Sequence, residues 1–199
     1  PDGHGEAGRA RLKARRVKTR QPVSLTEDEI AAVRSWVVHE DAHLIAFNKP
    51  SGLSSQGGRI QANTLDDLLW AFARSNGKRP ELVHRLDRDT SGLLVIAKKR
   101  SALTELQALM REGGGISKRY LALLAGRMPE GVMSVDQALQ KSVMQGGERM
   151  VRVDPDGKPS RSHFTLLERR GGHSYCEVRI ETGRTHQIRV HAAHLGHPV

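Results

Sequence analysis

The chain has 199 residues, with 32 Lys or Arg against 22 Asp or Glu, a formal net charge of +10 and an isoelectric point near 10.3. Its single cysteine, Cys176, excludes an intrachain disulfide, and a domain of this size buries roughly two-thirds of its unfolded surface without one. No run of about 18 apolar residues occurs and the N-terminus lacks a signal-peptide core, so we expect a cytoplasmic protein without a transmembrane helix. The charge favours a polyanionic partner: RNA, DNA or an anionic membrane.

Residues 1–24 form a basic arm. Its first 20 residues hold seven Lys or Arg against two acids, a net +5 and half of the total charge. Such a segment has little apolar surface to bury. It is expected to be a solvated tail or a phosphate-binding segment, and composition leaves both open.

From residue 25 onward, short apolar runs alternate with turn residues. Thr26 and Glu29 form a capping box, which predicts a helix that ends near Ser35. A strand is expected at 43–47, closed by a turn at 48–52 and followed by a loop at 54–59. The next helix, at 65–73, is capped by Asn63 or Thr64 and ended by Asn76-Gly77. A strand at 93–97 and a helix from Ser101 to the glycines at 113–115 complete this half.

The second half of the chain is richer in strands. The expected elements are a strand at 120–125, weaker strands at 134–139 and 150–153, a turn at 154–157, a strand pair at 162–167 and 175–180, and a helix at 185–195. Cys176 alternates with polar neighbours and is predicted to lie in the core. Short strands interleaved with three or four helices indicate an α+β fold rather than a doubly wound sheet.

One aspartate stands out chemically. Asp87 lies between Arg85 and Arg88 in a stretch of turn residues that leads into the apolar strand at 93–97. A carboxylate held beside cations stays ionised and can act as a nucleophile or a base. For an isolated aspartate in a charged loop, a helix cap or a structural ion pair is the commoner interpretation.

Two later segments carry further candidates. Tyr120, in Lys118–Ala122, could stack on a base or move a proton, or could be a core aromatic. Arg189 flanks the apolar stripe of the helix at 185–195, so it could point into a cleft and pair with a carboxylate, or lie on the surface.

Four histidines near the end of the chain raise the alternative of a metal site. His186, His191, His194 and His197 fall within twelve residues. No cysteine or acid lies between residues 182 and 199, and His186 and His191 point to different sides of the expected helix. We therefore expect no metal site.

Together and in this order, the segments resemble the RluA-type pseudouridine synthases, most closely those acting on large-subunit ribosomal RNA. The resemblance runs from His39 to Val199. The motifs that carry it are Asn48–Gly52, Val83–Gly92, Lys118–Ala122, Gly157–Ser160 and Thr182–His191. His-Arg-Leu-Asp alone would be weak evidence, but followed by Asp-Thr-Ser-Gly, and later by Gly-Arg-Thr-His-Gln-Ile-Arg, it is highly specific.

The resemblance implies the pseudouridine synthase catalytic fold, a mixed, mostly antiparallel sheet with flanking helices and a central active-site cleft. Residues 25–199 would be the catalytic domain, truncated at its C-terminus, and the arm 1–24 would end a missing N-terminal RNA-binding domain. The implied activity converts specific uridines in large-subunit ribosomal RNA to pseudouridine. It requires no cofactor and no metal, and a monomer is the default expectation.

The resemblance also implies roles for individual residues. Asp87 would be the essential carboxylate, Tyr120 would pack on the uracil and help remove the proton on carbon 5, and Arg189 would pair with the aspartate. Arg85 would enter the RNA stack where the target base leaves. Further RNA contacts are expected from His84, Lys49, Arg184 and His186. Two alternatives stay open, a non-catalytic basic RNA-binding module and a synthase that acts on tRNA.

Overall fold

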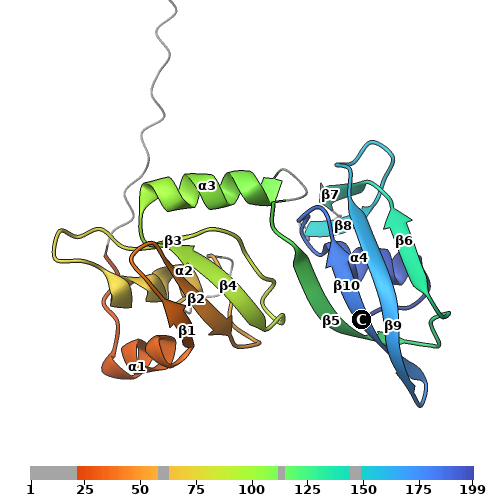
Figure 1. Cartoon of the computed structure of the whole chain (residues 1–199), viewed down its shortest axis with the longest axis horizontal. Coiled ribbons are helices and arrows are strands. Elements are labelled where there is room, and N and C mark those ends of the chain that lie inside the picture. Colours follow the sequence, from red (N-terminus) through yellow and green to blue (C-terminus); the bar gives the residue numbers. More distant parts are fainter. Residues whose placement is uncertain (1–21, 58–62, 112–114, 144–148) are drawn as a thin grey trace, which may run out of the picture.

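The computed structural model describes residues 22–57, 63–111, 115–143 and 149–199. It confirms an α+β fold in which every strand pair among these residues is antiparallel. Figure 1 shows two four-stranded sheets side by side, and α3 (Arg100–Arg111) lies along the first sheet and leads toward the second. None of the helices in the described ranges is both long and apolar enough to cross a membrane.

The first sheet has the strand order β1-β2-β4-β3. Its strands are β1 (Val37–Glu40), β2 (Leu44–Lys49), β3 (Glu81–Leu82) and β4 (Gly92–Ala97). Its core combines strand residues such as Phe47 and Ile96, both fully buried, with residues of α1 (Glu27–Ser35), α2 (Leu65–Leu68) and the 3-10 turn η1 (Leu69–Phe72). The capping box of α1 is confirmed, because Glu29 N–H donates to Thr26 Oγ1 and Thr26 N–H donates to the Glu29 carboxylate.

The second sheet has the order β5-β10-β9-β6. Its strands are β5 (Lys118–Ala125), β6 (Val132–Asp136), β9 (Arg161–Arg170) and β10 (His173–Ile180). Alternate residues of β10 are buried, among them Cys176, which is fully buried as predicted. Helix α4 (Gln187–His194) contributes Ala192 to this core, and the hairpin of β7 (Leu139–Val143) and β8 (Arg149–Val153) packs against α4.

Several predicted boundaries were wrong. The strand expected at 134–139 is divided between β6 and β7, because the chain turns after Asp136 to pair Leu139 with Val153 and Lys158. The helix expected at 65–73 changes to 3-10 geometry after Leu68. Strands β1 and β3 were not predicted. Residues 1–21 of the arm, 58–59 of the expected loop and the glycines 113–114 lie outside the described residues.

Candidate active site

A cleft of about 780 Å³ opens where the two sheets meet. The loop after β3 contributes Asp87, the last turns of α3 contribute Met110, and the start of β5 contributes Tyr120. The segment between β10 and α4, residues 182–186, forms another wall. The structure therefore brings three of the motifs marked in the sequence to one place.

The Asp87 loop is held mainly through its backbone. Ser55 Oγ donates to Leu86 O at 2.6 Å and accepts from Leu86 N–H at 3.1 Å. Gly52 N–H donates to Arg88 O at 2.9 Å, and Ser51 Oγ donates to Asp89 O at 2.9 Å. Because these bonds flank position 87 on both sides, the carboxylate is presented by a fixed backbone.

Lys49 was expected to contact RNA, but the structure places it in the interior. It is fully buried, and its ammonium donates to Pro50 O, Leu53 O and Arg88 O at 2.7, 2.8 and 3.1 Å. Burial lowers the pKa of this ammonium, and the charges of Asp89 and Asp87 partly offset the shift. Since all three ammonium hydrogens have carbonyl acceptors, Lys49 ties the turn after β2 to the Asp87 loop and does not reach the surface.

His84 also anchors the loop. Its Nε2 accepts a hydrogen bond from Val95 N–H of β4 at 3.1 Å, which requires the neutral imidazole. Burial, and secondarily the charge of Lys118, lower the pKa of His84. His84 lines the cleft, but as an uncharged ring rather than as the cation that phosphate binding would favour.

Two basic side chains approach the Asp87 carboxylate, whose side chain is 31% exposed. His186 Nε2 lies 3.9 Å from Oδ1, and Arg189 Nε lies 4.0 Å from Oδ2. Both distances are ion-pair separations that are too long for hydrogen bonds. The Arg189 guanidinium and the His186 ring therefore face the carboxylate without forming a hydrogen bond to either oxygen.

Tyr120 lies between the two halves of the molecule and packs against the cores of both sheets. Burial raises the pKa of its phenol, and the negative charge of Asp87 raises it further. The hydroxyl therefore stays protonated at neutral pH. A half-buried aromatic ring beside a carboxylate offers a flat apolar wall with a polar edge.

The rest of the cleft is cationic. Asp87 is the one acid among the described residues that line it, and the basic residues of the lining are Arg85, Arg88, Arg111, Lys118 and Arg184. Arg85 and Arg184 are exposed at the cleft, as an RNA-binding role requires. The charge distribution suits an anionic ligand that reaches past the cations to one carboxylate.

Two contributors to this site were not singled out from the sequence. Lys118, two residues before Tyr120, is half-buried in the cleft, where burial and the charge of Arg184 lower its pKa. Ser55, which holds Leu86, lay in a stretch predicted only as loop. Lys118 could have been predicted to lie in the site, because it is two residues from Tyr120 and therefore on the same face of the strand. Ser55 could not, because its contact with Leu86 joins residues 31 apart in the sequence.

The described residues contain no group of three or more His, Cys, Asp or Glu side chains that could hold a metal ion. Of the four clustered histidines, His186 faces Asp87 and His191 is buried on the opposite side, against β9. The structure thus separates residues that the sequence places close together.

The sequence profile of the family described as RNA pseudouridylate synthase matches residues 43–194, a range that includes Asp87, Tyr120 and Arg189. The chain belongs to this family. The fold agrees, because two solved structures superpose with a TM-score of 0.67 each. They are Human RNA Pseudouridylate Synthase Domain Containing 1, at 28% identity over 82% of this chain and 66% of that one, and Domain Containing 4, at 25% identity over 85% and 68%.

Within this pseudouridylate synthase family, curated relatives include proteins named ribosomal large subunit pseudouridine synthase C. Those of Escherichia coli K12 and Haemophilus influenzae are each 42% identical to this chain, over 100% and 92% of its length. The matches cover 63% and 56% of the relatives. The chain therefore spans less than two thirds of the length of these synthases.

Proposed function

We propose that the chain is the catalytic part of an RNA pseudouridine synthase that isomerises uridines in large-subunit ribosomal RNA. The observation that carries this proposal is the Asp87 carboxylate, partly exposed in a cationic cleft and approached by Arg189 and His186 without a hydrogen bond from either. The choice of ribosomal RNA over tRNA is supported by the names of relatives that are 42% identical over the whole chain. A non-catalytic RNA-binding module would have no need of a lone carboxylate among phosphate-attracting cations.

The isomerisation breaks the bond between N1 of uracil and C1′ of ribose and forms a bond between C5 and C1′. The proton on C5 leaves and N1 gains one, so the overall reaction consumes no other reactant. Asp87 begins the cleavage, as a nucleophile or as a base, while its charge is balanced by the guanidinium of Arg189. Since the backbone around Asp87 is fixed by Ser55 and Lys49, little reorganisation is needed when the substrate arrives.

Tyr120 packs on the detached uracil and keeps it in the cleft while it turns. A protonated phenol is a poor base. Its raised pKa therefore favours stacking and hydrogen-bond donation over removal of the C5 proton by Tyr120 in its resting state. Replacement with Phe should preserve RNA affinity and slow the reaction, because the ring remains and the hydroxyl is lost.

The target uridine must leave the RNA stack before its glycosidic bond can reach Asp87. Unstacking costs a few kcal/mol, which phosphate contacts from exposed arginines and an inserted side chain can offset. Arg85 lies two residues before Asp87 and is exposed at the cleft, so we assign it to the space that the base vacates. Arg184, on the opposite wall, is assigned to the backbone of the same RNA.

The test is to incubate the protein with unmodified transcripts of large-subunit ribosomal RNA and of tRNA, and to map pseudouridine in both. We expect pseudouridine at discrete positions of the ribosomal transcript. Modification of tRNA alone would contradict the assigned substrate, and binding of both RNAs without any pseudouridine would support the non-catalytic alternative.

A further inference from the structure

Three buried polar side chains connect α4 to β9 outside the cleft. Ser162 and His191 are fully buried and Gln187 is 3% exposed. A buried polar group without a partner costs free energy, so such groups are retained where every donor and acceptor is satisfied. These three are hydrogen-bonded to one another and to neighbouring backbone groups, and none of them lines the cleft.

The hydrogen bonds have a single consistent direction. Gln187 Nε2 donates to Ser162 Oγ at 2.9 Å, and Ser162 Oγ lies 2.9 Å from His191 Nδ1. His191 Nε2 lies 3.0 Å from Gln137 O, and since a carbonyl only accepts, the network assigns the proton to Nε2 and makes Nδ1 the acceptor of the Ser162 hydroxyl. Burial lowers the pKa of His191, in keeping with this neutral tautomer.

The same chain of bonds continues to the turn before α4. Gln187 Oε1 accepts from Thr182 Oγ1 at 2.8 Å and from Arg184 N–H at 3.0 Å. This closes the turn in which His186 has the left-handed conformation, φ 53° and ψ 21°, the one positive φ outside glycine among the described residues. The backbone of a residue other than glycine is strained in that conformation, and the strain persists only where neighbouring contacts impose it.

One face of α4 packs against β9, and another faces the Asp87 carboxylate. Gln187 and His191, four residues apart, share the face toward β9. His186, the cap residue, and Arg189, three residues on, approach Asp87. A helix of eight residues with no side-chain cap hydrogen bond does not fix its own orientation, so contacts with the sheet must set it.

We propose that Thr182, Gln187, Ser162 and His191 form a positioning relay that orients the first turn of α4 so that His186 and Arg189 face Asp87. None of the four touches the carboxylate, so their effect passes through His186 and Arg189. The proposed relay depends on the proposed function only in those tests that measure pseudouridine formation. It names four uncharged residues, three of them outside the cleft, as determinants of the catalytic geometry.

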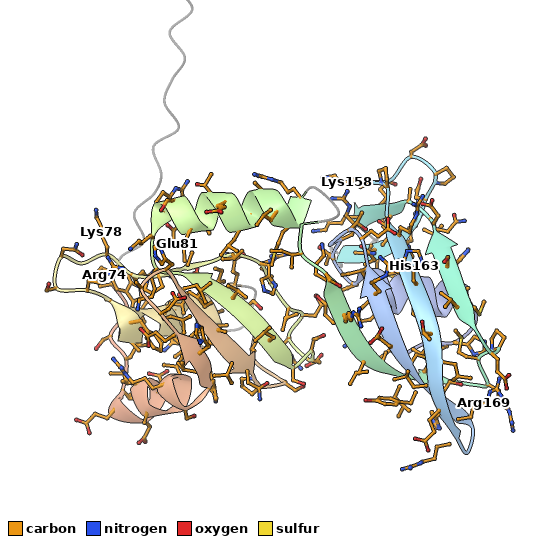
Figure 2. All side chains as sticks on the ribbon, viewed as in Figure 1. Arg74, Lys78, Glu81, Lys158, His163 and Arg169 are labelled. Carbon is orange, nitrogen blue, oxygen red and sulfur yellow. The ribbon has the colours of Figure 1, made fainter. Side chains whose placement is uncertain are left out.

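The test compares two Ser→Ala substitutions on the second sheet. Ser162→Ala breaks the relay. Ser134→Ala removes the exposed hydroxyl that lies 2.7 Å from His163 Nδ1 on β9, a strand residue labelled in Figure 2, and serves as the matched control. We expect Ser162→Ala to lower the single-turnover rate of pseudouridine formation about 10- to 100-fold at unchanged RNA affinity, as small misplacements of reacting groups do. Ser134→Ala should match the wild type.

A double-mutant cycle separates positioning from general stability. If the relay acts through Arg189, Ser162→Ala should lower the rate much less in an Arg189→Gln protein than in the wild type. Equal losses in both backgrounds, or a wild-type rate for Ser162→Ala, would overturn the proposal. Should Ser162→Ala fail to fold, His191→Gln, which keeps a donor and an acceptor, should be far more active than His191→Leu, and equal rates would overturn it.

A spectroscopic readout does not require activity. Asp87→Asn made in the otherwise wild-type protein should shift the ring resonances of His186 in ¹⁵N NMR spectra. The same substitution made in the Ser162→Ala protein should cause no such shift. A shift that persists would refute the relay. If the wild-type protein makes no pseudouridine, the proposed function fails, while this spectrum still decides the relay.

Discussion

The two halves of the site are held in place by different means. The Asp87 loop is fixed through backbone groups, with the buried ammonium of Lys49 and the hydroxyl of Ser55 as donors. The turn that presents His186 and Arg189 is fixed by an uncharged side-chain relay under α4. Damage to the first half should therefore cost folding stability, whereas damage to the second should mainly cost geometry.

The strongest way to break the first half is Lys49→Met. The substitution removes the ammonium from Pro50 O, Leu53 O and Arg88 O, of which only Arg88 O keeps a second donor among the described residues, Gly52 N–H, so the free energy of unfolding should fall by about 3 kcal/mol. Urea denaturation measures this. The control Lys78→Met, at the exposed position labelled in Figure 2, should change stability by less than about 0.5 kcal/mol. A Lys49→Met protein as stable as the control would disprove the assigned anchor.

The second half is tested by Arg189→Lys. Lysine keeps the charge but lacks the planar guanidinium whose Nε lies 4.0 Å from Asp87 Oδ2, so kcat should fall about 10- to 100-fold, as expected when a group beside the reacting carboxylate is misplaced. The melting temperature and RNA affinity should change little. The control is Arg119→Lys, at an exposed arginine of β5 that pairs with Glu177 of β10, and it should keep wild-type kcat. If both substitutions have the same kcat, Arg189 does not act on the aspartate.

Each half contains one histidine whose pKa burial lowers from its ordinary value of 6.5, His84 in the loop and His191 in the relay. Below pH 6.5 the unfolded chain binds protons that the folded chain refuses, so stability should fall as pH falls through this range. Each group contributes at most about 1.4 kcal/mol per pH unit. His191 also feels the charges of His194 and Asp136. Unfolding measured from pH 7 to 5 should show a shallower slope for His191→Gln, and an unchanged slope would refute burial of the neutral ring.

The smallest effect is expected for Arg85→Ala. Arg85 is exposed, so folding should be unaffected, while RNA affinity should weaken several-fold and the slope of log K against log salt should decrease by about 1. Filter binding at several salt concentrations measures both. Unchanged affinity and slope would remove Arg85 from the RNA interface.

Asp87, Tyr120 and Arg189 were selected by the family resemblance that their motifs carry, and the structure places Tyr120 in the same cleft as Asp87 and Arg189 near its carboxylate, while their catalytic roles stay predictions. The motifs failed for Lys49, which was expected to contact RNA and is buried, and they did not indicate that His84 anchors the loop as a neutral ring, while its contact with RNA stays a prediction. Burial of Lys49 depends on a carbonyl 39 residues away, and the neutral state of His84 depends on a strand 11 residues away. The contacts of Ser162 in the relay join residues 25 and 29 apart, and local periodicity contains no information about such contacts. The monomer and the arm's role remain predictions.

The most direct test of the account is Asp87→Asn, assayed with RNA tritiated at C5 of uracil. The amide keeps the size of the side chain and removes its charge, so the protein should bind RNA with at least wild-type affinity. It should release no tritium and form no pseudouridine, while the wild-type protein does both. Tritium release at the wild-type rate by Asp87→Asn would contradict the claim that this carboxylate carries the reaction.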